Sequence, residues 1–283
     1  MRSMLRRRAL GLLVALLAAV GLVGVAAPAA SASPVPRVHP AYLALGDSVP
    51  FGFRANLPPL LYNFPQLFVG YPEFVGPTLG LRTLNAACPG ETTDSFMNGS
   101  GSNGCEDAVN GGVAYRQHFP LHVNYSGTQM DYALSTLESN ANVRLVTVML
   151  GANDGFLCSE TTEPYCNDPT DIAGIVSHVR ANLESILGEL RSHYGGQIII
   201  VNYYALDYSD SAVFATQALN RVIRDAALDN DVTVADGFGA FQQRAMAAGG
   251  SSIAAGLVLP NDVHPTLLGQ YLLARAVEEA VEH

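Results

Sequence analysis

Five short apolar runs, separated by amphipathic segments, constrain the fold of this chain more than any other feature. The runs show little alternation of polar and apolar residues, which is typical of strands covered on both faces, as in a parallel sheet. They are Tyr42–Asp47, Leu81–Ala87, Val143–Leu150, Gln197–Tyr204 and Asp231–Ala235. Strands of this kind need helices on both sides of the sheet, so the runs favour an α/β protein.

Helical periodicity occupies the intervals between these runs. In Asp171–His193 the apolar residues recur at steps of three and four, which draws one apolar stripe along a helix. Ala212–Leu228 and Pro265–Val281 behave in the same way, and Met130–Ser139 is a weaker helix. Strand and helix in alternation predict a three-layer α/β/α fold around a five-stranded, parallel, doubly wound (flavodoxin-like) sheet. We expect residues 33–283 to form a single domain.

The first 32 residues are typical of a secretory signal peptide. Arginines precede an apolar run from Ala9 to Ala27, and Ala30-Ser31-Ala32 matches the small-residue cleavage pattern. The run is long enough for an uncleaved membrane anchor as an alternative. Its Ala- and Gly-rich character favours cleavage, which would leave a secreted protein without a stable membrane anchor. Export by the Sec or the Tat route stays open.

The charged residues exclude several classes of function. The chain has 15 basic residues, all of them arginine, and 25 acidic residues, for a formal net charge of −10. The absence of lysine excludes a phosphate-loop lysine, a Schiff-base lysine and a serine–lysine dyad. An acidic chain with no basic run after its first residues is not expected to bind nucleic acid.

Four cysteines indicate disulfides in an exported protein. Neighbour pairing, Cys88 with Cys105 and Cys158 with Cys166, is favoured because each pair brackets a segment without helix or strand periodicity. Four cysteines allow three pairings, and the sequence cannot choose among them. A zinc site is the alternative, but no pair has C-x-x-C spacing and no histidine pair accompanies them. We therefore expect no metal.

Polar motifs follow the predicted strands at the points where each strand ends. In a doubly wound sheet these carboxyl ends share one edge, where the functional residues gather. The motifs that follow the first, second and third strands and precede the last helix are Gly46-Asp47-Ser48, Cys88-Pro89-Gly90-Glu91-Thr92, Gly151-Ala152-Asn153-Asp154 and Asn261-Asp262-Val263-His264-Pro265. A hydroxyl, a glycine amide, a carboxamide and an imidazole are thus expected along one rim.

The four motifs resemble, in order, the sequence blocks of the SGNH or GDSL hydrolases, in particular their secreted actinobacterial branch. The matching residues are Gly46-Asp47-Ser48 with Gly52, then Gly90, then Gly151-x-Asn153-Asp154, then His264-Pro265. The resemblance covers the chain from about residue 41 to its end. It implies the α/β/α fold and a serine esterase or lipase that works through an acyl-enzyme without a cofactor.

The resemblance also implies a role for each motif residue. A serine hydroxyl becomes a nucleophile when an imidazole takes its proton, which assigns these roles to Ser48 and His264. The oxyanion would be held by the amides of Ser48 and Gly90 and by the side chain of Asn153. The substrate would be a small-molecule or lipid ester, and we expect the enzyme to be a monomer.

One residue departs from the family pattern. The family places its triad acid three residues before the histidine, and Asn261 occupies that position here. The carboxylate is one residue later, at Asp262. Either Asp262 reaches Nδ1 of His264, or Asn261 or a backbone carbonyl orients the ring. We favour Asp262, because a carboxylate also stabilises the imidazolium that forms.

Two stretches, Phe51–Phe74 and Thr92–Thr128, lack periodicity and are expected to be functional loops or disordered segments. The first is rich in aromatic residues and leaves the carboxyl end of the first strand. We expect Phe51 and Phe53 to wall a groove for the acyl chain, with simple packing inside the loop as the alternative. Two other functions stay open: a carbohydrate O-acetylesterase, and a non-catalytic extracellular binding module with the same fold.

Overall fold

The sheet is parallel throughout, and its strands lie in the order β2-β1-β3-β4-β5. The computed structural model describes residues 39–108, 113–161, 166, 169–209 and 213–281, all within one compact unit of the chain, Val38–His283. The predicted signal peptide, residues 1–32, lies outside the described residues. This strand order is that of flavodoxin-like sheets, so the predicted fold class is confirmed.

The strands coincide closely with the predicted apolar runs. They are β1 (Ala41–Gly46), β2 (Arg82–Asn85), β3 (Val143–Met149), β4 (Gln197–Val201) and β5 (Thr233–Ala235). All six residues of β1 are buried, and so are six of the seven in β3. Strands that are covered on both faces have no solvent side, which explains why these runs do not alternate.

Ten α-helices and two short 3₁₀ helices are assigned in the described residues. They are α1 (Ser48–Phe51), η1 (Pro59–Asn63), η2 (Pro65–Leu67), α2 (Pro72–Thr78), α3 (Thr93–Asn98), α4 (Tyr115–His118), α5 (Gln129–Ser139), α6 (Ala152–Thr161), α7 (Pro169–His193), α8 (Val213–Asp229), α9 (Gly237–Ala247) and α10 (Leu267–Ala280). The four predicted helices correspond to α5, α7, α8 and α10, with boundaries that agree within about two residues.

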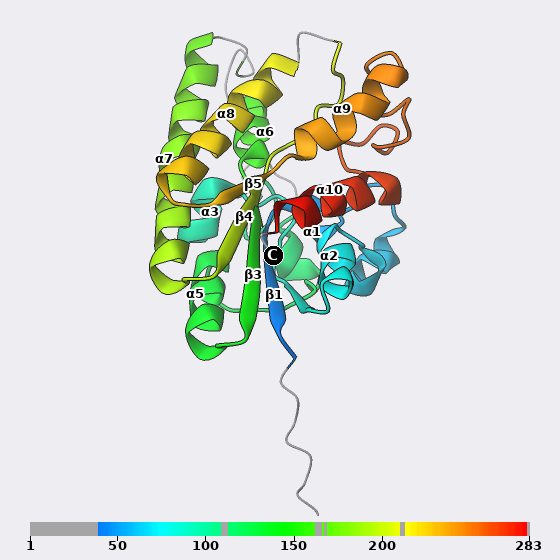
Figure 1. Cartoon of the computed structure of the whole chain (residues 1–283). Helices are drawn as coiled ribbons and strands as arrows, with labels where there is room; N and C mark the ends of the chain where they lie inside the picture. The colour runs from blue at the N-terminus through cyan, green and yellow to red at the C-terminus, as the bar shows by residue number, and fades with distance from the viewer. Residues whose placement is uncertain (1–38, 109–112, 162–165, 167–168, 210–212, 282–283) are drawn as a thin grey trace, which may run out of the picture. The chain divides into compact units, whose positions relative to one another are not determined.

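The helices form a layer on each side of the sheet (Figure 1). α7 packs against α8, α5, α3 and α6 in one layer, while α10 packs against α2 and α9 in the other. The apolar stripe of α7 is buried through Val179, Leu183, Ile186, Leu187 and Leu190. Together the two layers complete the α/β/α architecture that the alternating pattern predicted.

The direction in which successive strands are placed across the sheet reverses after β2. From β1 it runs outward to β2, then crosses back to β3 on the other side of β1. The two central strands are in register to their ends, where Gly46 pairs with Met149. Ligands of doubly wound sheets bind outside the carboxyl ends at such a switch point. The residues that follow Gly46 and Met149 therefore share one location.

Several short helices were not predicted from the sequence. α3 lies in the stretch Thr92–Thr128 and is started by a capping box, in which Thr92 and Ser95 bond each other's backbone amides. α9 is capped by Asp236, whose side chain accepts from the amide of Gly239. α6 begins directly after β3. These helices are specified by local caps and tertiary contacts, since none carries a long apolar stripe.

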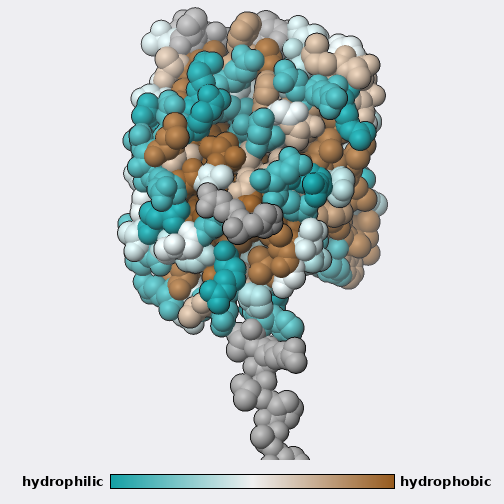
Figure 2. Space-filling model, viewed as in Figure 1, coloured by the Kyte–Doolittle hydropathy of each residue, from teal (hydrophilic) through white to brown (hydrophobic). Residues whose placement is uncertain are grey.

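Exposed apolar residues do not gather on the face of the molecule shown in Figure 2, where hydrophobic and hydrophilic residues are interspersed. Among the described residues, none of the helices combines the length and the apolar character that crossing a lipid bilayer requires.

Candidate active site

The Ser48 turn is built by the two residues before it. Gly46 ends β1 with φ +132°, and a Cβ there would clash with the carbonyl oxygen of Met149. Asp47 then caps α1 by accepting a hydrogen bond from the amide of Val49 at 2.9 Å. Ser48 is the first residue of this helix and is partly exposed. The turn thus holds a serine side chain at the carboxyl edge of the central strand.

Asp47 is buried and stabilises this turn by hydrogen bonds. The hydroxyl of Tyr203 donates to Oδ2 of Asp47 at 2.5 Å. Burial raises the pKa of Asp47 to about 6, although the bonds from Tyr203 and Val49 and the charge of His264 lower it. Asp47 therefore braces the Ser48 turn from below.

Gly90 lies in a tight turn that follows β2. Its φ is +85°, and a Cβ would lie 2.6 Å from the carbonyl oxygen of Asn103. The amide of Asn103 donates to the carbonyl of Gly90 at 2.8 Å. A disulfide from Cys88 to Cys105 links the two segments, and a second one joins Cys158 to Cys166, which is the neighbour pairing favoured from the sequence.

Asn153 and Asp154 lie in the first turn of α6, at the end of β3. Nδ2 of Asn153 donates to the carbonyl of Glu91 at 3.0 Å, and a primary amide has a second N–H. Asp154 accepts from the amide of Thr93 at 3.0 Å and from its hydroxyl at 2.5 Å. Burial raises the pKa of Asp154 to about 6, although the hydrogen bonds from Thr93 lower it. Asp154 thus ties α6 to α3, which is a structural role.

His264 and Asp262 contact each other directly. Nδ1 of His264 makes a short hydrogen bond with Oδ1 of Asp262. The other oxygen of Asp262 accepts from the amide of Ala55 at 3.1 Å, and the side chain is only 2% exposed. Burial raises the pKa of Asp262, but the bonds and charge of His264 and the amide of Ala55 outweigh it and hold the pKa below its ordinary value.

The backbone before His264 explains how the acid can be only two residues away. Asn261 has φ +56°, in the left-handed region that asparagine tolerates better than most residues. Tyr204 fixes the other side of the loop, since its hydroxyl donates to the carbonyl of Val263 at 2.6 Å. With this geometry Asp262, and not Asn261, bonds Nδ1.

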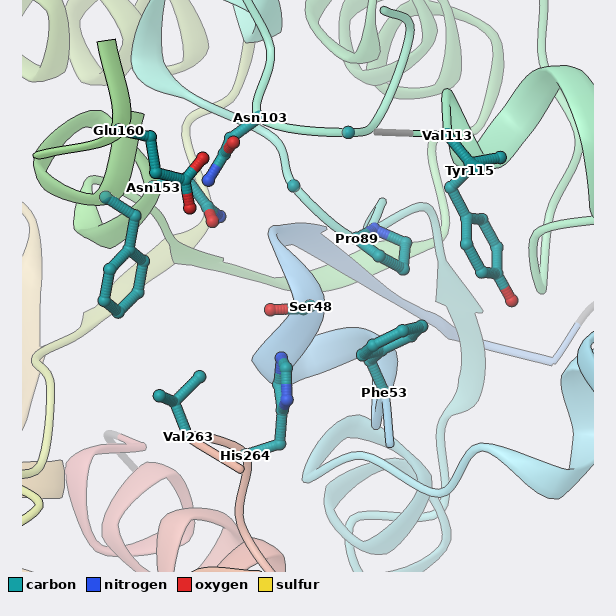
Figure 3. A pocket seen from close by; sticks show the side chains of 13 residues that line it. Ser48, Phe53, Pro89, Asn103, Val113, Tyr115, Asn153, Glu160, Val263 and His264 are labelled. Atoms are coloured by element: carbon teal, nitrogen blue, oxygen red, sulfur yellow. The ribbon is translucent and has the colours of Figure 1, made fainter. Parts of the chain in front are cut away.

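One pocket of about 370 Å³ brings the predicted residues together. Figure 3 shows the Ser48 side chain at its centre, with the imidazole of His264 extending toward it. The lining residues are Ser48, Phe53, Pro89, Gly90, Asn103, Gly104, Val113, Tyr115, Asn153, Phe156, Glu160, Val263 and His264. A hydroxyl, an imidazole, a glycine and a carboxamide therefore line the same pocket, and these are the groups that acyl transfer requires.

The two predicted phenylalanines lie in different places. Phe53 lines the pocket, and its ring centroid is 5.0 Å from that of His264. Phe51 is fully buried and its ring contacts Phe68, Tyr115 and His122. The expectation for Phe51 is therefore corrected: it is not among the residues that line the pocket, and its ring belongs to a buried apolar cluster.

Other wall residues were missed from the sequence. Tyr115 and Val113 come from the polar stretch Thr92–Thr128, and Phe156 and Glu160 come from α6. Asn153, Phe156 and Glu160 are spaced by three and four residues, which would place them on one face of a helix. That helix was not predicted, so this signal was not available.

One group of potential metal ligands occurs among the described residues, namely Cys88, Glu91 and Cys105. Its two cysteines form a disulfide, so their sulfur atoms are not the thiolates that bind metal ions.

Comparison with a family of known proteins decides the class of the chain. The model of the GDSL-like lipase/acylhydrolase family matches residues 44–272, which include all four motifs. The chain belongs to this family. Membership assigns it to the esterases and acylhydrolases, as the sequence motifs predicted. No curated protein matches the sequence significantly.

Two solved structures illustrate the proteins that share this fold. An acetylxylan esterase from Geobacillus stearothermophilus is 18% identical with a TM-score of 0.54, covering 86% of this chain and 94% of its own. An extracellular lipase from Streptomyces rimosus is 20% identical with a TM-score of 0.57, covering 86% of this chain and all of its own (100%). At this identity the likeness establishes the shared fold.

Proposed function

We propose that this chain hydrolyses carboxylic esters through an acyl-enzyme formed on Ser48. The observation that carries the proposal is the pocket in which Ser48, Gly90, Asn153 and His264 meet, with Nδ1 of His264 bonded to Asp262. A GDSL family model over 44–272 supports the same chemistry.

The reaction uses each of these groups in turn. His264 takes the proton of Ser48 as the hydroxyl attacks the ester carbonyl, and Asp262 stabilises the imidazolium that forms. The amides of Ser48 and Gly90 and the second N–H of Asn153 donate to the oxyanion. His264 then protonates the leaving alcohol, and a water activated by His264 releases the acid from Ser48.

The pocket walls favour an uncharged ester. One side of Ser48 is apolar, formed by Pro89, Phe53, Tyr115 and Val113 (Figure 3). None of the described lining residues is arginine, and the chain contains no lysine, so no permanent cation would neutralise a phosphate or a free carboxylate. The apolar side suits an acyl chain, because buried apolar area is the main source of affinity there.

A carbohydrate O-acetylesterase is the second candidate. The side of Ser48 opposite Phe53 has the polar groups of Asn103, Asn153 and Glu160 (Figure 3). Hydroxyl-rich alcohols could use such donors and acceptors, and one protein of the same fold is an acetylxylan esterase. An ester panel of varied acyl length and alcohol separates the two: strict preference for acetyl groups on sugars favours the second candidate.

The decisive experiment compares the wild type with Ser48→Ala on a simple chromogenic ester. We expect hydrolysis by the wild type, none by Ser48→Ala, and stoichiometric labelling of Ser48 by an organophosphate. A folded wild type that neither hydrolyses the panel nor takes up the label would instead favour a non-catalytic binding module.

We also propose that the protein is secreted. Two disulfides and a fold shared with an extracellular lipase support an oxidising location outside the cell. Expression from residue 1 in a secreting host, followed by N-terminal sequencing, tests this proposal: a secreted protein should begin at Ser33.

A further inference from the structure

Glu91 is a fully buried carboxyl group for which the reaction above has no use. It directly follows Gly90, and none of it is exposed. Its Oε1 accepts from the hydroxyl of Ser95 at 2.5 Å, and its Oε2 accepts from Nε2 of Gln129 at 2.8 Å. Burying a carboxyl costs free energy unless it is neutral or well bonded, so a buried one beside an active site calls for an explanation.

Gln129 extends these contacts to the Ser48 turn. This side chain is also fully buried. Its Oε1 accepts from the amide of Gly46 at 2.5 Å, and its Nε2 donates to the carbonyl of Gly46 at 3.0 Å. Gln129 therefore holds both backbone groups of the residue that ends β1, two positions before Ser48, while it also bonds Glu91.

The backbone of Glu91 makes the third connection. Its carbonyl accepts from Nδ2 of Asn153 at 3.0 Å, and this bond fixes which way the Asn153 amide faces. The three segments that supply oxyanion donors thus meet at one residue. Glu91 is connected to the Ser48 turn through Gln129, and it directly follows Gly90 in the chain. Its backbone carbonyl is bonded to Asn153.

The charges around Glu91 favour its neutral form. Glu106 lies beside it, paired with Arg116 at 2.8 Å through Oε1. Oε2 of Glu106 is buried without a hydrogen-bond partner in the described part of the chain, so it can accept a hydrogen bond from a protonated carboxyl group. Burial and the charge of Glu106 raise the pKa of Glu91 well above its ordinary value. Tyr125, under the Arg116 guanidinium, completes the surroundings and is neutral, since burial also raises its pKa.

We propose that protonated Glu91 is the positioning residue that holds the Ser48 turn, Gly90 and Asn153 in the geometry of an oxyanion hole. The proton lets Glu91 donate to Glu106 while its oxygens accept from Ser95 and Gln129. Ionisation would remove that donor and set two carboxylates against each other in a buried site. The inference rests on the proposed ester hydrolysis, since it concerns the donors of that reaction.

Three variants test the proposal through kcat and KM on a simple ester. Glu91→Gln keeps the size and a donor, so we expect kcat within about threefold of the wild type. Glu91→Ala frees the oxyanion segments, and we expect kcat to fall by about 10²-fold with little change in KM, comparable to losing one oxyanion donor. Glu73→Ala is the matched control: its buried carboxyl bonds Asn85 and the amide of Gly70 and does not contact Gly90 or Asn153.

The pH profile separates positioning from general stability. In the wild type, kcat should fall at alkaline pH as Glu91 ionises, while the folded fraction by circular dichroism stays constant. Glu91→Gln has no proton to lose and should lack this fall. An alkaline fall that persists unchanged in Glu91→Gln, or a loss of kcat in Glu91→Ala no larger than in Glu73→Ala, would overturn the proposal.

Infrared spectroscopy gives a readout that does not depend on activity. A protonated-carboxyl band that persists at about pH 8 and disappears in Glu91→Gln is the expected result. If the wild type has this band but hydrolyses no ester, the proposed function fails while the neutral Glu91 stands. If the band is missing and the ester is hydrolysed, the positioning proposal fails and the function stands.

Discussion

At the scale of single residues, the acid that orients His264 lies one position later in the chain than the family pattern places it. Asn261 has φ +56°, and this left-handed residue turns the backbone so that the next side chain, Asp262, bonds Nδ1. The amide of Ala55 holds the second oxygen of Asp262. Both oxygens of the carboxylate are therefore held in place, and Asp262 can orient His264 although only two positions separate them in the chain.

Asp262→Asn should lower kcat by about 10³–10⁴-fold, because the amide can neither stabilise the imidazolium nor hold the same tautomer. Steady-state kinetics on a simple ester measure this loss. Asn261→Gly is the control, since glycine adopts φ +56° freely and should retain nearly full activity. Full activity in Asp262→Asn would mean that a backbone carbonyl orients the ring.

Phe51 and Phe53 offer a matched pair for the acyl side of the pocket. Phe53→Ala should raise KM for long acyl chains more than for acetyl esters, because it removes apolar surface from the pocket wall. Phe51→Ala should instead lower the free energy of unfolding by about 3–5 kcal/mol, since its ring is fully buried. A chain-length series and denaturant unfolding distinguish these effects, and an equal loss for all acyl lengths in Phe53→Ala would refute the assignment.

At the scale of elements, short segments with little regular structure carry most of the site. The turn with Gly90, the stretch up to α5 and the loop before α10 each contribute pocket residues, while the strands provide the frame. A disulfide, helix caps and a second apolar cluster that includes Phe51, Phe68 and Tyr115 hold these segments. The disulfide from Cys88 to Cys105 is the strongest of these interactions.

Removing this disulfide by Cys88→Ala/Cys105→Ala should reduce the free energy of unfolding by about 3 kcal/mol, from the closed loop of 17 residues. It should also lower kcat, because Gly90 lies inside that loop. The Cys158–Cys166 disulfide closes a loop of 8 residues, so Cys158→Ala/Cys166→Ala is the control and is expected to cost somewhat less stability. Denaturant unfolding and ester kinetics check both, and unchanged kcat in the first variant would contradict the role of the disulfide in the site.

At the scale of the whole molecule, buried acids make stability depend on pH in an unusual direction. Burial raises the pKa of Asp47 and of Asp154 to about 6 and that of Glu73 to about 7. A group whose pKa is higher in the folded state binds its proton more tightly there. Its contribution to stability is complete at low pH and is lost as pH rises through the raised pKa.

We therefore expect the free energy of unfolding to decrease between about pH 4 and pH 7, by up to about 1.4 kcal/mol per pH unit for each group. Asp262 has the opposite sign, because its pKa is lowered, and its contribution is lost below about pH 4. Denaturant unfolding at several pH values measures the slope. Glu73→Gln should flatten it toward pH 7, and a stability that rises steadily from pH 4 to 7 would contradict the expectation.

The sheet and the long helices could be predicted because their patterns are set by burial alone. β1, β3 and β4 are covered on both faces, so their apolar runs are continuous, and α7, α8 and α10 each face the sheet with one stripe. The motif residues Ser48, Gly90, Asn153 and His264 follow these elements. Parallel topology then brings them to one edge whatever the loops do.

What the tertiary structure alone decided concerns contacts between segments far apart in the chain. Phe51 and Phe53 look equivalent in sequence, yet one enters the core and the other reaches His264. Tyr115 and the Glu91–Gln129 contact depend on loops without periodicity. Local sequence fixes a pattern of burial, whereas the direction of a loop side chain depends on which distant atoms fill the space around it. That is the physical reason why the rim of the pocket could be predicted, whereas of its walls only Phe53 could.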